Sequence, residues 1–220
     1  SATVIAAELL ECASADLELR EGGAGIVGAP GKQISLADIA RHARGWDRVR
    51  RDGLEPGLEQ TTYYEPPTVT WAYATHAAIV EVDAETGVVR IERYAIAHDC
   101  GTIVNPLLVD GQIVGGVVQG LGGALGEAIH YDATGQILGG SFLDYAMPRA
   151  ADLPDFAIVH DEHPSPLNPL GVKGLGEGGA IAPPVAIANA VCDALAHLGL
   201  EIDRTPIDAA NLLDVIQRSR

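Results

Sequence analysis

A helix that contains seven glycines is not stable alone in water, and residues 105–131, NPLLVDGQIVGGVVQGLGGALGEAIHY, predict such a helix. Asn105 suits the position that caps a helix, and Pro106 suits its first turn. The glycines that follow are Gly111, Gly115, Gly116, Gly120, Gly122, Gly123 and Gly126. Each costs a helix roughly 0.5–1 kcal/mol relative to alanine, so this helix needs a body packed against its bare backbone. That body is either another part of the protein or a large ligand, and the pattern favours neither.

A second glycine-rich segment, GVKGLGEGGA at residues 171–180, contains the GxGxxG pattern of dinucleotide-binding folds. In those folds the pattern follows a buried strand and precedes an acidic residue by about 20 positions. Here the preceding residues, HPSPLNPL, contain three prolines, which cannot donate to a β-ladder. The first acidic residue downstream, Asp193, lies inside a predicted helix. The pattern therefore does not indicate a dinucleotide site.

What remains in this loop is one glutamate, Glu177, held between glycines just before a helix. Glycines let a backbone approach another body closely, so Glu177 is a candidate catalytic base. The alternative is a surface loop whose glutamate faces water, which is the usual environment of this residue type. Lys173 either neutralises Glu177 or points at an anionic ligand.

Composition restricts the possible partners. A chain of 220 residues that is 47% hydrophobic can bury a core, while a net charge of −16 argues against binding to nucleic acid. We expect no membrane-spanning apolar stretch and no signal peptide at the start of the sequence. The cysteines are far apart and form no CxxC pair, which predicts neither a disulfide framework nor a structural zinc site. They favour a reducing, cytoplasmic compartment. The cysteines are Cys12, Cys100 and Cys192.

The first part of the chain predicts a helix at residues 2–13 and then a strand that enters a helix, in GKQISLADIARHA. Ser35 and Asp38 resemble a capping box at the start of that helix. Residues 46–70 predict an irregular connection. We therefore place a subregion at residues 1–60 and the main region at residues 61–220.

The main region predicts two hairpins and further helices. AAIVEV and VVRIERYAI form the first hairpin around DAETG, and EAIHYDATGQILGG forms the second, turning at 132–135. FAIVH predicts a strand, residues 183–198 a helix that ends at Gly199, and Thr205–Pro206 the start of a last helix. Helices mixed with hairpins favour an α+β fold over a doubly wound sheet.

Two polar clusters are weaker candidates. HDEH at residues 160–163 offers metal-ligating side chains, but alternate residues of a strand face opposite ways and the spacing lacks the i, i+4 histidine pair. HDC at residues 98–100 has no nucleophile elbow beside it. We predict no protein-ligated metal in this chain.

Three long blocks resemble the molybdenum hydroxylase large subunits of the aldehyde oxidase and xanthine dehydrogenase family, specifically the C-terminal part of the carbon-monoxide-dehydrogenase-like branch. The blocks are DCGTIVNPLLVDGQIVGGVVQGLGGALGEAIHYD, GSFLDYAMPRAADLP and PSPLNPLGVKGLGEGGAIAPPVAIANAVCDAL. The resemblance extends over essentially the whole chain. It implies the α+β molybdopterin-binding fold of that family.

The resemblance also implies roles for particular residues. Glu177, in the GxKGxGE pattern, is expected to be the base beside the molybdenum, and Gln112, in the DGQIxGG pattern, to hydrogen-bond the pterin. We also assign Asn105, Lys173, Gly174 and Gly176 to cofactor binding, because glycine-lined backbone can approach a bulky anionic group. The reaction implied is hydroxylation of an aldehyde, an N-heterocycle or a CO-like substrate with oxygen from water.

The implied cofactor is molybdopterin-type, in its cytosine dinucleotide form, with FAD and iron–sulfur clusters on partner chains. The implied partners are the remainder of the large subunit, an FAD subunit, an iron–sulfur subunit and a small-molecule substrate, with neither nucleic acid nor membrane. Family large subunits are several times longer than this chain, so we expect it to hold part of the pocket and to be inactive alone. The alternative is a non-catalytic binding or assembly module of the same fold.

Overall fold

The computed structural model describes residues 2–44, 57–59 and 61–219, and it divides the chain into two compact units, Ser1–Glu65 and Pro66–Arg220. The boundary lies five residues beyond the one expected from the sequence. Of the segment expected to be irregular, residues 46–56 and 60 lie outside the described residues. Residues 57–59 and 61–70 contain neither helix nor strand. Each unit is described below by itself.

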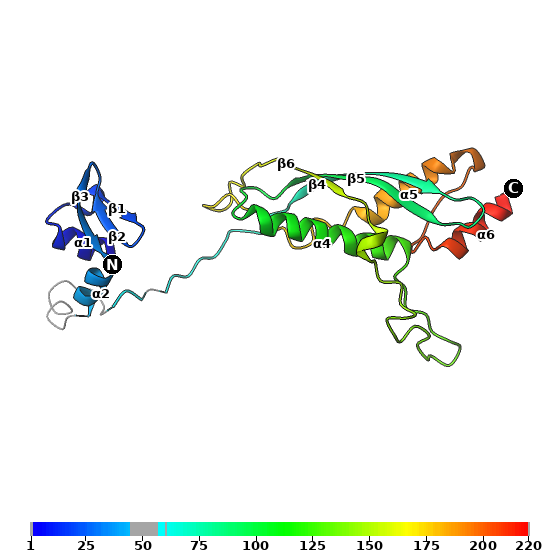
Figure 1. Ribbon diagram of the computed structural model, residues 1–220, viewed down its shortest axis with the longest axis horizontal. Coiled ribbons are helices and arrows are strands. Elements are labelled where there is room, and N and C mark those ends of the chain that lie inside the picture. Colours follow the sequence, from blue (N-terminus) through cyan, green and yellow to red (C-terminus); the bar gives the residue numbers. More distant parts are fainter. Residues whose placement is uncertain (1, 45–56, 60, 220) are drawn as a thin grey trace. The chain divides into compact units, whose positions relative to one another are not determined.

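The first unit is a three-stranded antiparallel sheet with helices (Figure 1). Its core contains Ile5, Ala24 and Ile39, which join α1, the sheet and α2. The cap expected at Ser35 is confirmed, since its hydroxyl accepts a hydrogen bond from the Asp38 amide at 3.1 Å. The elements are α1 (Ala2–Leu9), η1 (Ser14–Asp16), β1 (Leu17–Arg20), β2 (Gly23–Ile26), β3 (Ala29–Ser35) and α2 (Leu36–Ala43).

The helix predicted at residues 2–13 is too long, because α1 ends at Leu9. The Cys12 amide bonds to the Ala7 carbonyl and the Glu11 amide to the Glu8 carbonyl, while Glu11 has a φ of 53°. This pattern is a Schellman C-cap, whose left-handed residue is usually glycine. A glutamate in that position gives no sequence cue, so the end of the helix was missed, as were β1 and β2.

The second unit is built on a three-stranded sheet of order β4-β5-β6. The first predicted hairpin is confirmed as antiparallel β4 and β5, and β6 then pairs parallel to β5 after the chain has passed through α4 (Figure 1). The elements are β4 (Tyr73–Val82), β5 (Val89–Asp99), α4 (Pro106–Leu125), η2 (Ala150–Asp152), β6 (Phe156–His160), α5 (Pro183–Ala194), η3 (Ala196–Leu198) and α6 (Ala209–Ser219). The fold class is α+β, as predicted.

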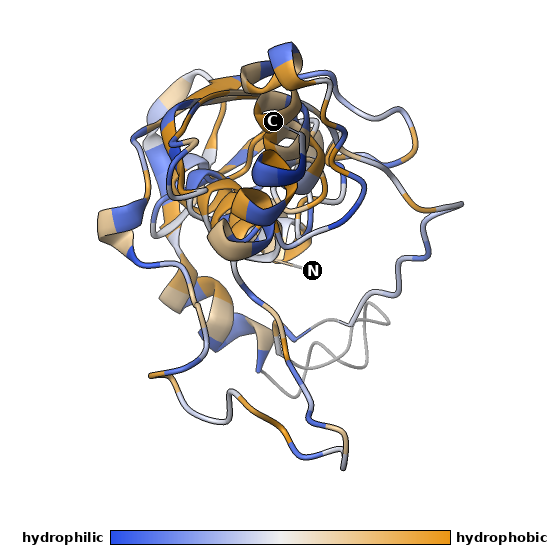
Figure 2. Ribbon diagram, turned by 90° about the vertical axis from the view of Figure 1, so that its right-hand side faces the viewer, coloured by the Kyte–Doolittle hydropathy of each residue, from blue (hydrophilic) through white to orange (hydrophobic). Residues whose placement is uncertain are grey.

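One face of this sheet forms the main core. Alternate residues of β5, namely Tyr94, Ile96 and His98, are buried, and the helices α4 and α5 contribute Ile113 and Ile187 to the same cluster. In Figure 2 the packed helices and strands carry broad orange stretches, which mark hydrophobic residues. The residues that alternate with the buried ones on β5, such as Ala95 and Ala97, are exposed.

Five glycines of α4 divide into two groups, while Gly122 lies against Glu127 and Pro148. A Cβ atom on Gly116 would lie 3.0 Å from Gly179 Cα, and one on Gly120 would lie 2.7 Å from the Ala180 carbonyl oxygen. Positions 111, 115 and 123 have open space instead. The body packed on the first group is therefore the protein's own loop before α5. The other group leaves bare backbone exposed among the described residues.

By length and composition alone, α4 could cross a membrane, so the expectation of no such stretch is wrong by that criterion. This is weak evidence, since the buried core helix of a soluble protein passes the same test. In the described structure α4 packs on α5 and contributes Ile113, Val117 and Leu121 to the core.

Three predicted elements differ from the structure. The second hairpin is reduced to a single bridge between Tyr131 and Ile137. Its turn is closed by the Asp132 carboxylate, which accepts hydrogen bonds from the Thr134 and Gln136 amides. The last helix begins at Ala209 rather than at Thr205, because the Asp208 carboxylate accepts from the Asn211 amide and so caps the helix there. The strand at residues 156–160 is confirmed, as is the start of a helix at Pro183. The helix predicted at residues 183–198 is too long, because α5 ends at Ala194 and residues 196–198 form the 3-10 helix η3, which Gly199 ends with a φ of 65°.

The two groups of glycines predict opposite effects of alanine. Gly120→Ala should lower the free energy of unfolding by about 1–3 kcal/mol, because the new methyl group overlaps the backbone of residue 180. Gly115→Ala, the matched control, should raise it by roughly 0.5–1 kcal/mol, since its site is open and alanine favours a helix. Urea denaturation of the chain measures both, and equal changes would contradict this packing.

Candidate functional site

The loop that carries Glu177 is a series of tight turns against α4. The Gly178 amide bonds to the Leu175 carbonyl and the Ala180 amide to the Glu177 carbonyl, at 3.0 Å each. Gly179 lies so close to the Ile113 carbonyl that a side chain there would overlap it. The Glu177 side chain is exposed, and within the described part of the chain its carboxylate makes no hydrogen bond or ion pair.

Gln112 reaches this loop from α4. Its side-chain Nε2 donates to the Gly176 carbonyl at 2.9 Å. The structure therefore brings together Gln112, Gly176 and Glu177, which the sequence had placed in one site. Gln112 bonds protein backbone here, so its hydrogen bond to a pterin stays a prediction.

Lys173 makes its ion pair with Asp99 and not with Glu177. The Lys173 ammonium lies 2.5 Å from Asp99 Oδ2, and both side chains are about nine-tenths buried, with exposed fractions of 10% and 11%. The Tyr73 ring lies under the same ammonium, 5.0 Å from its centroid. A cofactor-binding role of Lys173 stays a prediction.

Two further residues assigned to the cofactor have local structural roles. Asn105 caps α4, since its side-chain oxygen accepts from the Leu108 amide at 3.3 Å. The Gly174 amide bonds to the Thr70 carbonyl at 3.3 Å, and a Cβ on Gly174 would lie 3.1 Å from that oxygen. Gly176 has open space at its Cβ position. Their contacts with a cofactor stay predictions.

The burial of His98 below the loop was missed by sequence reasoning, which considered this residue only within HDC. His98 is 1% exposed, and both of its ring nitrogens are without a hydrogen-bond partner among the described residues. Its Nε2 lies 2.5 Å from where a Cβ of Gly178 would stand, so glycine is required above it. Burial lowers the pKa of His98, and the neighbouring His160 lowers it further. Burial likewise lowers the pKa of His76.

The residues of HDEH point in different directions. His160 Nε2 lies 2.7 Å from the Asp110 carboxylate on α4, whereas Glu162 accepts from the Ile103 amide at 2.9 Å. His163 lies beside Asp99 through its amide, at 3.2 Å. No group of three or more metal-ligating side chains gathers within residues 2–44, 57–59 and 61–219.

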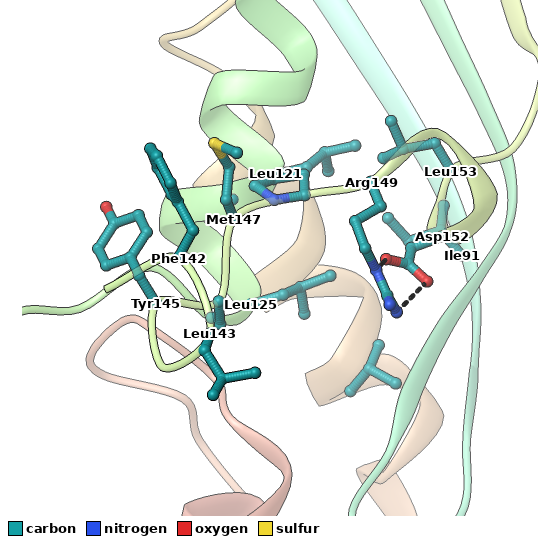
Figure 3. Close-up of a pocket in the computed structure, with 15 residues that line it drawn as sticks. Ile91, Leu121, Leu125, Phe142, Leu143, Tyr145, Met147, Arg149, Asp152 and Leu153 are labelled. Carbon is teal, nitrogen blue, oxygen red and sulfur yellow. Dashed lines mark hydrogen bonds and ion pairs between the residues drawn. The ribbon is translucent and has the colours of Figure 1, made fainter. Parts of the chain in front are cut away.

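A separate cavity of about 630 Å³ lies at the other end of α4 (Figure 3). Leu121, Leu125 and Ile91 line it, together with Phe142, Met147 and other residues of the segment after α4. Arg149 and Asp152 form an ion pair at its edge, at 2.8 Å. Ten helical residues, or about 15 Å, separate Gln112 from Gly122 at this cavity. The Glu177 loop does not line it.

Comparison with known proteins places the chain among cofactor-binding domains. A family described as "Molybdopterin cofactor-binding domain" matches residues 1–154, which include Asn105 and Gln112 but not Glu177. The nicotine 6-hydroxylase large subunit of Paenarthrobacter nicotinovorans is 43% identical over 206 residues, which are 92% of this chain and 25% of the relative. The carbon monoxide dehydrogenase large chain of Afipia carboxidovorans is 35% identical over 216 residues, 97% of this chain and 26% of the relative.

Solved structures agree with these relatives. Quinoline 2-oxidoreductase from Pseudomonas putida 86 matches with a TM-score of 0.87 and 40% identity, covering 98% of this chain and 28% of that one. A Cu,Mo-CO dehydrogenase matches with a TM-score of 0.85 and 34% identity, covering 99% and 27%. The chain therefore spans about a quarter of the length of the curated relatives it matches.

The buried histidines predict a pH dependence of stability. The pKa of His98 and of His76 is lowered in the folded chain, so the unfolded chain binds protons first as pH falls. The free energy of unfolding should decrease below the ordinary histidine pKa, about 6.5, by up to about 1.4 kcal/mol per pH unit for each histidine.

His98→Gln should flatten this dependence between pH 7 and 5, as measured by urea denaturation at each pH. Ile96→Val is a suitable control, because it removes a buried methyl group at a cost of about 0.5–1.5 kcal/mol without changing a titrating group. A slope in His98→Gln equal to that of the original chain would contradict the assignment.

Proposed function

Because the chain belongs to the molybdopterin cofactor-binding domain family, we propose that it forms one wall of the active site of a molybdenum hydroxylase, with Glu177 as its catalytic base. The observation that carries this proposal is the position of Glu177. Its carboxylate is exposed and lies in a loop packed directly on the cofactor-domain helix α4. A general base needs such access to the proton that it removes.

The residues around Glu177 fit a bulky anionic cofactor. Gly111 and Gly115 on α4 and Gly176 in the loop all have open space at their Cβ positions. A cofactor can therefore approach this backbone closely. Gln112 lies between the two helical glycines. Its side-chain amide uses one N–H to bond to the Gly176 carbonyl, so its other N–H and its oxygen are left for a cofactor. We propose that Gln112, with the backbone of Gly174 and Gly176, holds the cofactor, and that Asn105 supports it by capping α4. Direct binding of the cofactor by Lys173 is the alternative to the role that its ion pair with Asp99 suggests.

The molybdenum cofactor supplies the two-electron redox chemistry of such a hydroxylation. In our proposal, the Glu177 carboxylate accepts a proton from a water-derived oxygen nucleophile as that oxygen attacks an electrophilic carbon. The glycines on either side of Glu177 leave the carboxylate free to reach the substrate side of the site. Gln112 fixes the loop one residue before the base.

Finer points of the proposal rest on the relatives and on the resemblance of the sequence. The cofactor would be the cytosine dinucleotide form, and FAD and iron–sulfur clusters on partner subunits would accept the electrons. The substrate would be an aldehyde, an N-heterocycle or a CO-like molecule, and the complex would be cytoplasmic. Relatives named for nicotine, quinoline and carbon monoxide support trials of these three compounds. The second candidate function is a non-catalytic assembly module of the same fold.

The first test replaces the base in a complete complex. Glu177→Gln keeps the size of the side chain and removes the proton acceptor, so turnover should fall about 10²–10⁴-fold. The molybdenum content should not change. Nicotine, quinoline and carbon monoxide serve as trial substrates with a dye as electron acceptor. Glu92→Gln, an exposed glutamate on β5, is the matched control and should keep full turnover.

Undiminished turnover in Glu177→Gln would exclude Glu177 as the base. A complex that binds molybdenum but oxidises no compound in either form would favour the assembly module.

The second test uses the chain without the remainder of a large subunit. We expect it to retain no molybdenum cofactor, because an open wall leaves the hydrogen bonds of the cofactor in competition with water. Metal analysis and pterin fluorescence after gel filtration measure retention. Adding the remainder of the subunit should restore it, and stoichiometric cofactor on the chain alone would show that the whole site lies here.

A further inference from the structure

We propose that Asp99 and Lys173 are positioning residues for Glu177: their buried ion pair anchors the upstream end of the catalytic loop. This inference rests on the proposed function, in which Glu177 is the base. Lys173 precedes Glu177 by four residues, and its ammonium lies 2.5 Å from Asp99 Oδ2. Both side chains are about nine-tenths buried.

Asp99 connects three segments at the end of β5. Its Oδ1 accepts hydrogen bonds from the Gly101 amide at 2.8 Å and from the His163 amide at 3.2 Å, while Oδ2 accepts from Lys173. Burial raises the pKa of Asp99, but these hydrogen bonds outweigh burial and hold the pKa below its ordinary value. The Asp99 carboxylate is therefore charged at neutral pH and forms an ion pair with Lys173.

The backbone of Lys173 is held at the same place. Its amide donates to the Cys100 carbonyl at 2.8 Å, and the neighbouring Val172 forms a bridge with Gly101. Gly101 has a φ of 69° and lies against the Gly171 carbonyl, so only glycine fits there. The side-chain pair and these backbone bonds together hold the upstream end of the loop against the end of β5.

Beyond Lys173 the loop has little stiffness of its own. Four of the next six residues are glycines, at positions 174, 176, 178 and 179, and glycine restricts the backbone least. The downstream end is fixed by backbone packing of Gly179 on α4 and by the turn from the Ala180 amide to the Glu177 carbonyl. Between Lys173 and Glu177, the Gly174 amide bonds to the Thr70 carbonyl at 3.3 Å and Gln112 bonds to the Gly176 carbonyl. With so permissive a backbone, the position of Glu177 depends on the anchors at both ends.

A buried ion pair is weak evidence of stabilisation, because apolar residues of similar size often replace such a pair without loss. Here the ion pair constrains geometry. The Lys173 ammonium reaches the Asp99 carboxylate only when the upstream end of the loop lies in one position beside the end of β5. A direct contact of Lys173 with the cofactor is the competing explanation. That contact would make cofactor content depend on Lys173, whereas positioning makes the motion of the loop and the rate depend on it.

The experiment uses the complete complex, with Lys173→Met, Lys173→Arg and Asp99→Asn. Hydrogen exchange of the amides at 174–178 reports the loop without any substrate. We expect exchange to rise about tenfold in Lys173→Met, and kcat to fall up to about 10²-fold, as a misplaced catalytic group does. KM and molybdenum content should stay within about twofold. Lys173→Arg should reverse part of the rise in exchange and part of the fall in kcat. Arg90→Met is the control, since it breaks an exposed pair with Glu81 on the same hairpin.

A variant with one unpaired buried charge can fail to fold. Asp99→Asn combined with Lys173→Met removes both charges and keeps a side-chain oxygen for the Gly101 and His163 amides, so it should keep the fold while the loop exchanges faster. Unchanged exchange in this double variant would overturn the inference. Loss of molybdenum from Lys173→Met with unchanged exchange would also overturn it, in favour of direct cofactor binding.

A double-mutant cycle separates this inference from the proposed function. If Lys173 acts through Glu177, Lys173→Met should lower kcat no further in a Glu177→Gln background. Additive losses would mean that Lys173 acts independently of Glu177 and would overturn the inference. Full turnover in Glu177→Gln alone would instead overturn the role of the base, and the exchange of the loop would still decide whether the ion pair positions it.

Discussion

Backbone-to-backbone packing between α4 and the loop before α5 determines the arrangement of this site. Gly116 and Gly120 of the helix lie against Gly179, Ala180 and Pro183, so neither side can carry larger side chains at these points. The contact places the last turn of the Glu177 loop and the start of α5 on one helical face. A helix weakened by its glycines is thereby stabilised by tertiary packing, and the same glycines bring the candidate base to the helix backbone.

The polar groups buried below the loop are accommodated in two different ways. Asp99 and Lys173 form an ion pair, and the Gly101 and His163 amides donate to the other carboxylate oxygen of Asp99. Both ring nitrogens of His98 and Nε2 of His76 have no partner among the described residues, while His76 Nδ1 lies 3.0 Å from the Tyr94 hydroxyl. Burial lowers the pKa of both histidines, so they are neutral near pH 7. An unpaired buried polar group is costly, and such sites are unusual in natural structures. His98 lies directly beneath Gly178, so its protonation would disturb the loop at that point.

Local sequence patterns correctly predicted those helix caps and strands whose signal lies within a few neighbouring residues. The caps at Ser35 and Asn105, the first hairpin and the strand at residues 156–160 follow from turn, capping and alternation patterns. The end of α1 was missed because a glutamate occupies the left-handed position where glycine is usual. The start of α6 was missed because Asp208, rather than Pro206, provides the cap. These departures depend on hydrogen bonds that composition does not encode.

At the site, too, motifs that are short in sequence were predictable, whereas a contact between distant segments was not. The resemblance of the sequence brought Gln112, Gly176 and Glu177 together correctly in space, since ordered motifs preserve their spatial relation. The partner of Lys173 could not be found in this way, because Asp99 lies 74 residues earlier and meets it only through the bridge between Gly101 and Val172. His98 was considered only as a neighbour of Cys100. Its burial comes from the alternation along β5, a cue that was available in the sequence.

The exposed apolar surface of the chain is consistent with a single wall of a larger site. Phe142 and Leu143, beside the cavity at the end of α4, are 84% and 94% exposed, and Ile79 and Val159 lie exposed on the sheet. In our proposal the remainder of a large subunit covers them, since the chain spans about a quarter of the length of its relatives. Covering the wall would also remove water from around Glu177. The carboxylate, now exposed beside bare glycine backbone, would then face the cofactor and its substrate in place of solvent.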